Sequence, residues 1–161
     1  MASAPETRPP PTKPFCTFVY KELKGSKLKI DIHIPSSLNN APFFVALFIP
    51  GGGWMRVNRD DYSHVLCDEL HRLNYVFCSM NYGLLPETPV TELLEHINAA
   101  GTWIRQNLCQ EMENMNVKVD CSKLLVLGQS TGGWAALVAV YPSFTSNVRN
   151  STVNYFYRLY L

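Results

Sequence analysis

Hydrophobic and polar residues alternate along residues 27–34, and this pattern predicts a strand with two different faces. The apolar positions are Leu28, Ile30, Ile32 and Ile34, and the polar ones are Lys27, Lys29, Asp31 and His33. A period of two puts one set of side chains in the core and the other in water, as at the antiparallel edge of a sheet. We therefore expect His33 to be solvated. Gly25 is expected to join this strand to an earlier one over residues 17–22.

Three later stretches are apolar almost without interruption. They cover residues 43–49, 75–80 and 124–127, and glycine, proline or polar residues bound each of them. Continuous apolar runs of this length predict strands that are buried on both faces. Such strands are typical of a parallel sheet that helices cover on both sides.

Apolar residues at helical spacing separate these runs. They are Tyr62, Leu66, Leu70 and Leu73 in the first helical stretch and Val90, Leu93, Leu94, Ile97, Gly101, Ile104 and Leu108 in the second. We expect Asp60 to cap the first helix, and Thr88 with Pro89 to open the second. A third helix is expected to start after Ser130 and run toward Pro142. This alternation predicts an α/β fold with a mostly parallel sheet flanked by helices.

The composition fits one globular domain. The chain has 161 residues, of which 47% are hydrophobic and 17% charged, and its formal net charge is +1. That charge provides no basic field for nucleic acid, and no apolar run reaches the roughly 18 residues of a membrane span. We divide the chain into a disordered proline-rich tail (1–14), a partial α/β core (15–142) and a C-terminal segment (143–161). The sequence leaves the oligomeric state open.

The N-terminus and the cysteines predict a cytoplasmic protein. Residues 1–14 are too polar and too rich in proline for a signal peptide. A binding peptide for an SH3-like partner is the alternative to a solubilising tail there. No C-x-x-C pair occurs among the five cysteines, so we expect most of them to be reduced and partly buried. These cysteines are Cys16, Cys67, Cys78, Cys109 and Cys121.

The segment Gly128-Gln129-Ser130-Thr131-Gly132 matches G-x-S-x-G between a predicted strand and a predicted helix. In that context the pattern indicates a nucleophile elbow, where the serine adopts a strained conformation and the glycines avoid clashes with the turn. The N–H group of Thr131 would lie at a helix N-terminus, which stabilises negative charge. Ser130 is therefore the candidate nucleophile. The alternative is a tight turn in which the serine only caps the helix.

A second glycine-bearing loop, Pro50-Gly51-Gly52-Gly53-Trp54, directly follows the predicted strand at residues 43–49. In an α/β fold both loops lie outside the carboxyl ends of the strands, where ligands bind. Glycines let the backbone approach a carbonyl oxygen closely, and each N–H donor at an oxyanion contributes roughly 3–4 kcal/mol. We therefore expect the N–H groups of Gly51 and Gly52 to face an oxyanion. The alternative is a merely flexible turn.

Four signatures together resemble the hormone-sensitive-lipase-like (fold-3) carboxylesterases of the α/β-hydrolase superfamily. They are Pro50-Gly51-Gly52-Gly53-Trp54 for HGGG-W, Tyr82-Gly83-Leu84-Leu85-Pro86-Glu87 for Y-R-L-A-P-E, Asp120-Cys121-Ser122-Lys123-Leu124 for D-x-S-R-I, and Gly128-Gln129-Ser130-Thr131-Gly132-Gly133 for G-D-S-A-G-G. The resemblance implies hydrolysis of small-molecule carboxylic esters through an acyl-serine intermediate, without a cofactor or a metal. It also implies an oxyanion hole made by Gly51, Gly52 and Thr131. Kynurenine formamidases have similar loops, so amide-type substrates stay open.

The chain departs from this pattern after Ser130. The acid and histidine of the family follow the serine, but the 31 residues after Ser130 contain no Asp, Glu or His. All four histidines precede it, and we expect His64, His71 and His96 to lie on solvated helix faces. A serine without a base is a poor nucleophile, so this chain is expected to be nearly inactive. The alternative is a non-catalytic protein that binds a small ligand in the same cleft.

Three smaller departures concern the edge of the sheet and the loops. The sheet would stop at the strand over residues 124–127 and leave an unpaired apolar edge, which favours aggregation. Residues 143–161 are then either a replacement strand or the product of a truncated reading frame. Pro50 replaces a histidine that shapes the glycine loop. Gly83 replaces an arginine that would fix its own loop by hydrogen bonds.

Overall fold

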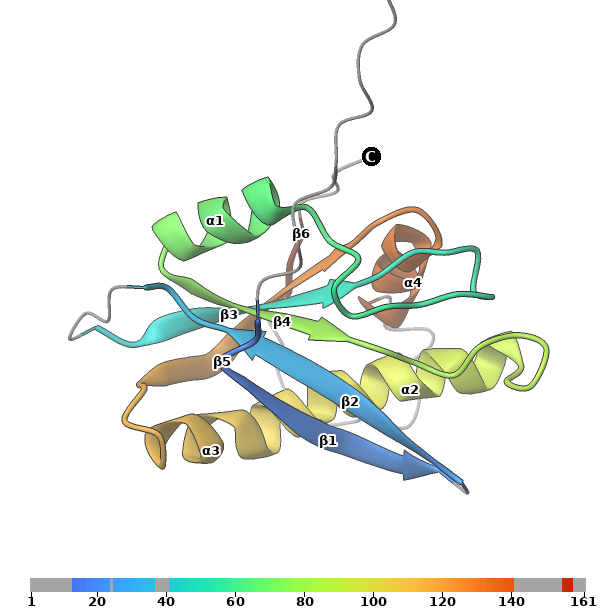
Figure 1. Cartoon of the computed structure of the whole chain (residues 1–161), viewed down its shortest axis with the longest axis horizontal. Helices are drawn as coiled ribbons and strands as arrows, with labels where there is room; N and C mark the ends of the chain where they lie inside the picture. Colours follow the sequence, from blue (N-terminus) through green and yellow to red (C-terminus); the bar gives the residue numbers. More distant parts are fainter. Residues whose placement is uncertain (1–12, 24, 37–40, 141–154, 158–161) are drawn as a thin grey trace, which may run out of the picture.

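The computed structural model describes residues 13–23, 25–36, 41–140 and 155–157, which form a mixed sheet with helices on both faces (Figure 1). The strands lie in the order β1-β2-β4-β3-β5-β6. Their bounds are β1 (Cys16–Leu23), β2 (Ser26–His33), β3 (Phe43–Ile49), β4 (Tyr75–Met80), β5 (Val119–Gly128) and β6 (Tyr155–Tyr157). β1 and β4 each pair with β2 in antiparallel fashion, whereas β3–β4, β3–β5 and β5–β6 are parallel. The predicted α/β class is confirmed.

The helices follow the predicted order with small differences at their starts. They are α1 (His64–Arg72), α2 (Val90–Trp103), the π-helical turn η1 (Ile104–Leu108), α3 (Cys109–Glu113) and α4 (Thr131–Val140). Ser63 caps α1 by accepting a hydrogen bond from the N–H of Leu66 at 3.4 Å, so Asp60 is not the cap. Pro89, and not Thr88, occupies the cap position of α2. The cap of α1 thus lies three residues after the predicted one, whereas that of α2 lies one residue after it.

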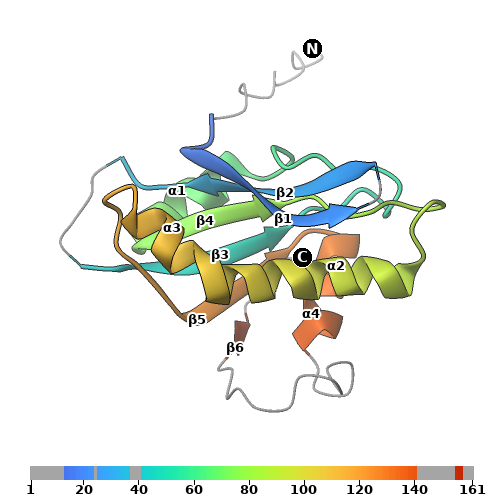
Figure 2. The same ribbon diagram turned by 90° about the horizontal axis from the view of Figure 1, so that it is seen from below.

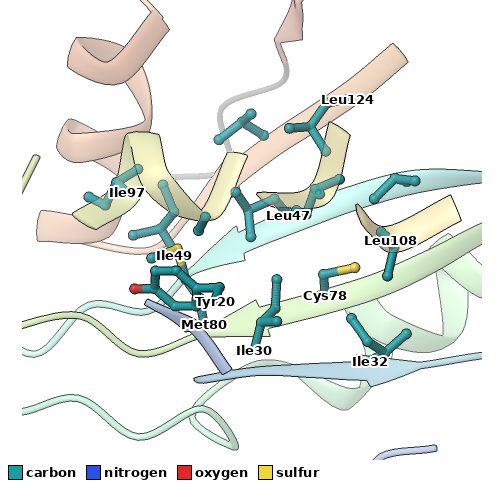
Figure 3. Packing of buried hydrophobic residues seen from close by; sticks show 14 of the residues in the cluster. Tyr20, Ile30, Ile32, Leu47, Ile49, Cys78, Met80, Ile97, Leu108 and Leu124 are labelled. Carbon is teal, nitrogen blue, oxygen red and sulfur yellow. The ribbon is translucent and has the colours of Figure 1, made fainter. Parts of the chain in front are cut away.

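Each face of the sheet packs against its own set of helices (Figures 1 and 2). On one face, Phe48 and Phe77 of the strands pack with Cys67 and Leu70 of α1 and with the nearby Tyr62. The larger core lies on the other face, beneath α2, η1 and α4. Figure 3 shows part of it, including Ile97, Leu108, Leu47, Ile49 and Cys78. The continuous apolar runs thus correspond to β3, β4 and β5, which contribute side chains to the cores on both faces.

The predicted solvated face of β2 is confirmed for Lys27 and Lys29, which are exposed, and wrong for its second half. Asp31 and His33 are both buried, as are Ile30 and Ile32 on the other side of the strand. The segment before α1 covers the polar side: the guanidinium Nε of Arg59 lies 2.8 Å from a carboxylate oxygen of Asp31. The Tyr62 hydroxyl lies 3.4 Å from Nε2 of His33. Alternation along one strand carries no information about a distant segment that covers its polar face.

The buried His33 makes the stability of the fold dependent on pH. Burial is the main cause that lowers the pKa of His33, from 6.5 to about 4, and the nearby charge of Asp31 opposes it. In the unfolded chain this histidine takes up a proton below about pH 6.5, while in the folded chain it stays neutral until about pH 4. We therefore expect the free energy of unfolding to fall by about 2–3 kcal/mol over that interval.

Urea unfolding at a series of pH values measures this effect. The variant His33→Leu should lose the part of the pH dependence that His33 causes, with a remainder from His71 and His96, whose pKa values burial also lowers. An equal fall in His33→Leu and in the wild type would contradict the assignment.

Two of the five cysteines form a disulfide, which corrects part of the cysteine prediction. Cys109 at the start of α3 is bonded to Cys121 in β5. Cys16, Cys67 and Cys78 are free, and burial raises the pKa of Cys67 to about 12. The spacing of 12 residues carries no signature of a pair, because the folding of η1 and α3 back onto β5 brings the two residues together.

The outer side of β5 is paired, which corrects the expectation of an open edge. Leu124, Leu125 and Val126 stand opposite Tyr155, Phe156 and Tyr157 in parallel register. Most of the proposed tail (1–14) and of the proposed C-terminal segment (143–161) lies outside the described residues, which include only 13–14 and 155–157 of them.

Candidate active site

The chain reverses at Ser130 between the end of β5 and the start of α4. Ser130 has a φ of 54°, in the left-handed region that non-glycine residues seldom adopt. The turn is held by N–H groups of Gly132 and Gly133, which donate to the carbonyl oxygens of Gln129 (2.9 Å) and Ser130 (3.0 Å). Ser130 itself is exposed. A strained serine presented at the carboxyl end of a parallel strand is the geometry of a nucleophile elbow.

The two glycines of G-x-S-x-G are required by close backbone contacts. A Cβ atom on Gly128 would overlap the carbonyl group of Gly132. A Cβ atom on Gly132 would overlap the carbonyl oxygen of Ile49 and lie 2.6 Å from that of Pro50. The elbow therefore packs directly against the end of β3. The two glycines of the pattern are therefore required by the packing of the turn itself, apart from the family resemblance.

The glycine loop after β3 lies beside the elbow. A Cβ atom on Gly51 would stand 2.7 Å from the carbonyl oxygen of Gln129 and 3.1 Å from Cβ of Ser130. Gly52 has a φ of 103°, and its carbonyl oxygen accepts N–H groups of Met55 (3.3 Å) and Arg56 (3.2 Å). The structure thus brings Gly51, with Gly52 next to it in the chain, beside Ser130, although almost 80 residues separate them in the sequence.

Tyr82 holds the glycine loop in place. Its hydroxyl donates to the carbonyl oxygen of Pro50 at 2.6 Å and approaches that of Gly51 at 3.3 Å. Burial raises the pKa of Tyr82 to about 12, so the hydroxyl keeps its proton at neutral pH. A second bond joins the N–H of Leu85 to the carbonyl oxygen of Trp54 at 2.9 Å. The sequence shows Tyr82 only as part of a signature and not as a support of the glycine loop. Its hydrogen-bond partners are backbone atoms, which leave no pattern in the sequence.

Thr131 is the first residue of α4, so its N–H group stands at the helix N-terminus. In the described part of the chain, the turn bonds of the elbow use the N–H groups of Gly132, Gly133 and Trp134, and none uses that of Thr131. The rings of Trp54 and Trp134 pack with their centroids 5.2 Å apart and join the two loops. Gly51, Gly52 and Thr131 are thereby gathered around Ser130.

Within the ranges that the structure describes, none of the four histidines forms a hydrogen bond with Ser130. His33 and His64 pack against Tyr62, and Nε2 of His71 lies 3.7 Å from the Cys67 sulfur. His96 accepts a hydrogen bond from the N–H of Gly83 and is fully buried. The expectation that His96 is solvated is therefore wrong, because the loop after β4 covers that side of α2.

The described residues contain no group of three or more His, Cys, Asp or Glu side chains arranged to hold a metal ion. They also contain no helix with the length and apolar character to cross a bilayer.

The sheet order, the strained serine between β5 and α4, and the adjoining glycine loop define an α/β-hydrolase fold of the esterase-like kind. The predicted superfamily is thereby confirmed. The chain belongs to the BD-FAE family, whose model matches residues 30–158.

Solved structures of similar fold come from Thermogutta terrifontis esterase 2. Its propionate-bound form is 25% identical with a TM-score of 0.63, covering 81% of this chain and 47% of that one. The form phosphonylated by cyclosarin is 23% identical with a TM-score of 0.63, covering 80% and 48%. Over 127 residues the chain is also 35% identical to the non-reducing polyketide synthase pkbA of Emericella nidulans, covering 78% of this chain and 5% of that protein. The chain thus spans about half of the esterase and a small part of the synthase.

Proposed function

We propose that this chain carries the nucleophile and the oxyanion hole of a serine hydrolase that acts on small-molecule carboxylic esters. Ser130 attacks the ester carbonyl and forms an acyl-serine intermediate, and the N–H groups of Gly51, Gly52 and Thr131 stabilise the oxyanion. The observation that carries the proposal is the close approach of Gly51 to the exposed, strained Ser130.

Similarity to known proteins supports this chemistry. The propionate-bound and phosphonylated forms of Thermogutta terrifontis esterase 2 share the fold. A carboxylate and an organophosphorus group are both expected at a site that handles acyl transfer. The resemblance to a segment of a polyketide synthase extends the candidate acyl groups to polyketides.

The 161-residue chain is proposed to be nearly inactive by itself. No Asp, Glu or His follows Ser130 in it, and the histidines that precede Ser130 have other partners. Loss of the histidine in a serine hydrolase costs on the order of 10⁶ in turnover. The oxyanion hole and substrate binding alone retain roughly 10³-fold catalysis over water.

A second candidate function is non-catalytic binding of a small ligand in the same cleft. Within the described residues, His33, His71 and His96 have partners other than Ser130, and this favours it. The strained Ser130 opposes it, because binding alone gives no reason to keep a serine at a φ of 54°.

Hydrolysis of p-nitrophenyl propionate separates the two functions. For the esterase we expect slow release of p-nitrophenol above the buffer rate, and we expect Ser130→Ala to reduce it to the buffer rate. For a pure binding protein, wild type and Ser130→Ala would give the same rate. A matched control is Ser122→Ala, which lies in β5 outside the elbow and should leave the rate unchanged.

A further inference from the structure

His96 is a fully buried histidine of α2 that the proposed chemistry does not use. Its Nδ1 accepts a hydrogen bond from the backbone N–H of Gly83 at 3.2 Å. A ring nitrogen that accepts carries no proton, so the proton of the neutral ring lies on Nε2. Nε2 has no hydrogen-bond partner among the described residues, and a carboxylate oxygen of Glu92 stands 3.9 Å from it. The ring is therefore oriented by its bond to Gly83.

Gly83 lies close against the His96 ring, with no room for a Cβ atom between them. A Cβ atom on Gly83 would stand 2.9 Å from Cε1 of His96 and would overlap the Thr88 hydroxyl. The loop is closed by a further bond from the N–H of Thr88 to the carbonyl oxygen of Leu84 at 2.8 Å. No larger side chain fits at position 83 while Thr88 and His96 keep their places. The glycine that departs from the resembled signature is thus matched to the histidine beneath it.

The loop at residues 82–88 is also the support of the glycine loop. Tyr82 bonds to the carbonyl oxygen of Pro50, and the N–H of Leu85 bonds to that of Trp54. These two bonds flank Gly51–Gly53 on both sides. A displacement of residues 82–88 would therefore move the donors that face Ser130.

We propose that His96 is a positioning residue: its neutral ring fixes residues 82–88 through Gly83, and through Tyr82 it fixes the Gly51–Gly53 loop beside Ser130. The effect on catalysis rests on the esterase function proposed above. The effect on the order of the two loops does not, and it is measured separately.

Protonation of His96 would break this arrangement. A proton on Nδ1 replaces the acceptor with a second donor, which then faces the N–H of Gly83. Burial is the main cause that lowers the pKa of His96; Lys21 of β1 also lowers it, whereas Glu92 and Glu95 of α2 raise it. The bond is therefore present above the ordinary histidine pKa, and it is lost as the pH falls through the lowered value.

Hydrogen–deuterium exchange tests this role with two variants. Leucine at position 96 removes the acceptor, whereas the side-chain oxygen of asparagine can stand where Nδ1 stands. We expect His96→Leu to speed amide exchange in residues 50–56 and 82–88 by about tenfold, with α1 unchanged. His96→Asn should restore the slow exchange. In the wild type, exchange of the same segments relative to that of α1, corrected for the intrinsic rate, should rise as the pH falls from 7 to 4, and in His96→Asn this ratio should stay constant; comparison with α1 removes the global loss of stability that His33 causes.

Unchanged exchange in both segments of His96→Leu, or an equal rise in α1, would overturn the proposal. So would a rise of these segments relative to α1 at low pH that persists in His96→Asn. If His96→Leu fails to fold, the pH series of wild type and His96→Asn decides the question alone. Failure of Ser130 to react, with the expected exchange pattern intact, would count against the esterase function and not against the role of His96.

Discussion

Replacing Gly132 with alanine is expected to lower the free energy of unfolding by about 3 kcal/mol or more. The new methyl group would overlap the carbonyl oxygen of Ile49 and stand 2.6 Å from that of Pro50. Backbone atoms at the end of a central strand cannot move aside as a flexible side chain can. The elbow would have to separate from β3, and the contact of Gly51 with Ser130 would be lost with it. Urea unfolding followed by circular dichroism measures the change.

Gly101→Ala is the matched control for that variant. Gly101 lies within α2, and a Cβ atom there would meet its nearest neighbours at 3.8 and 3.9 Å, which is ordinary contact. Alanine is favoured over glycine inside a helix by about 1 kcal/mol, so this variant should be as stable as the wild type or more so. A Gly132→Ala protein as stable as Gly101→Ala would show that the elbow does not pack against β3 as described.

Added imidazole is expected to restore the reaction of Ser130 with a fluorophosphonate. In that reaction the serine oxygen attacks phosphorus, fluoride leaves, and a base accepts the hydroxyl proton. The chain supplies no such base after Ser130, so the reaction should be slow in plain buffer. Free imidazole can act as this base. Because it is not held in place, we expect it to accelerate the reaction on the order of tenfold.

Two variants control the imidazole experiment. Ser130→Ala should form no adduct at any imidazole concentration. Gly52→Ala keeps the serine but strains the glycine loop, since position 52 has a φ of 103° and a Cβ atom there would overlap the carbonyl oxygen of Arg56. It should form the adduct more slowly than the wild type in the same buffer. Equal rates in wild type and Gly52→Ala would remove the glycine loop from the account.

The sequence was sufficient to predict the α/β class because the relevant signals are local. Continuous apolar runs marked β3, β4 and β5, and helical spacing marked α1 and α2. The glycine patterns also predicted which loops adjoin, since both follow parallel strands and the carboxyl ends of parallel strands meet at one edge. The structure adds the contact itself, between Gly51 and the turn at Gln129 and Ser130.

What the sequence could not predict depends on contacts between distant segments. The burial of His33 comes from Tyr62 and the segment before α1, and that of His96 from the loop at Gly83. Tyr82 acts on backbone oxygens, which leave no pattern in the sequence. The disulfide between Cys109 and Cys121 likewise depends on how α3 returns to β5. The periodicity of a strand or helix shows which of its faces is apolar. It does not show which distant segment covers the polar face.

The most direct test of the account is to locate the fluorophosphonate adduct by peptide mass spectrometry, in the presence of imidazole. We predict a single adduct, on the peptide that contains Ser130, and its loss in Ser130→Ala. An adduct spread over other serines and tyrosines, or an equal yield in Ser130→Ala, would contradict the assignment of Ser130 as the nucleophile of an esterase site.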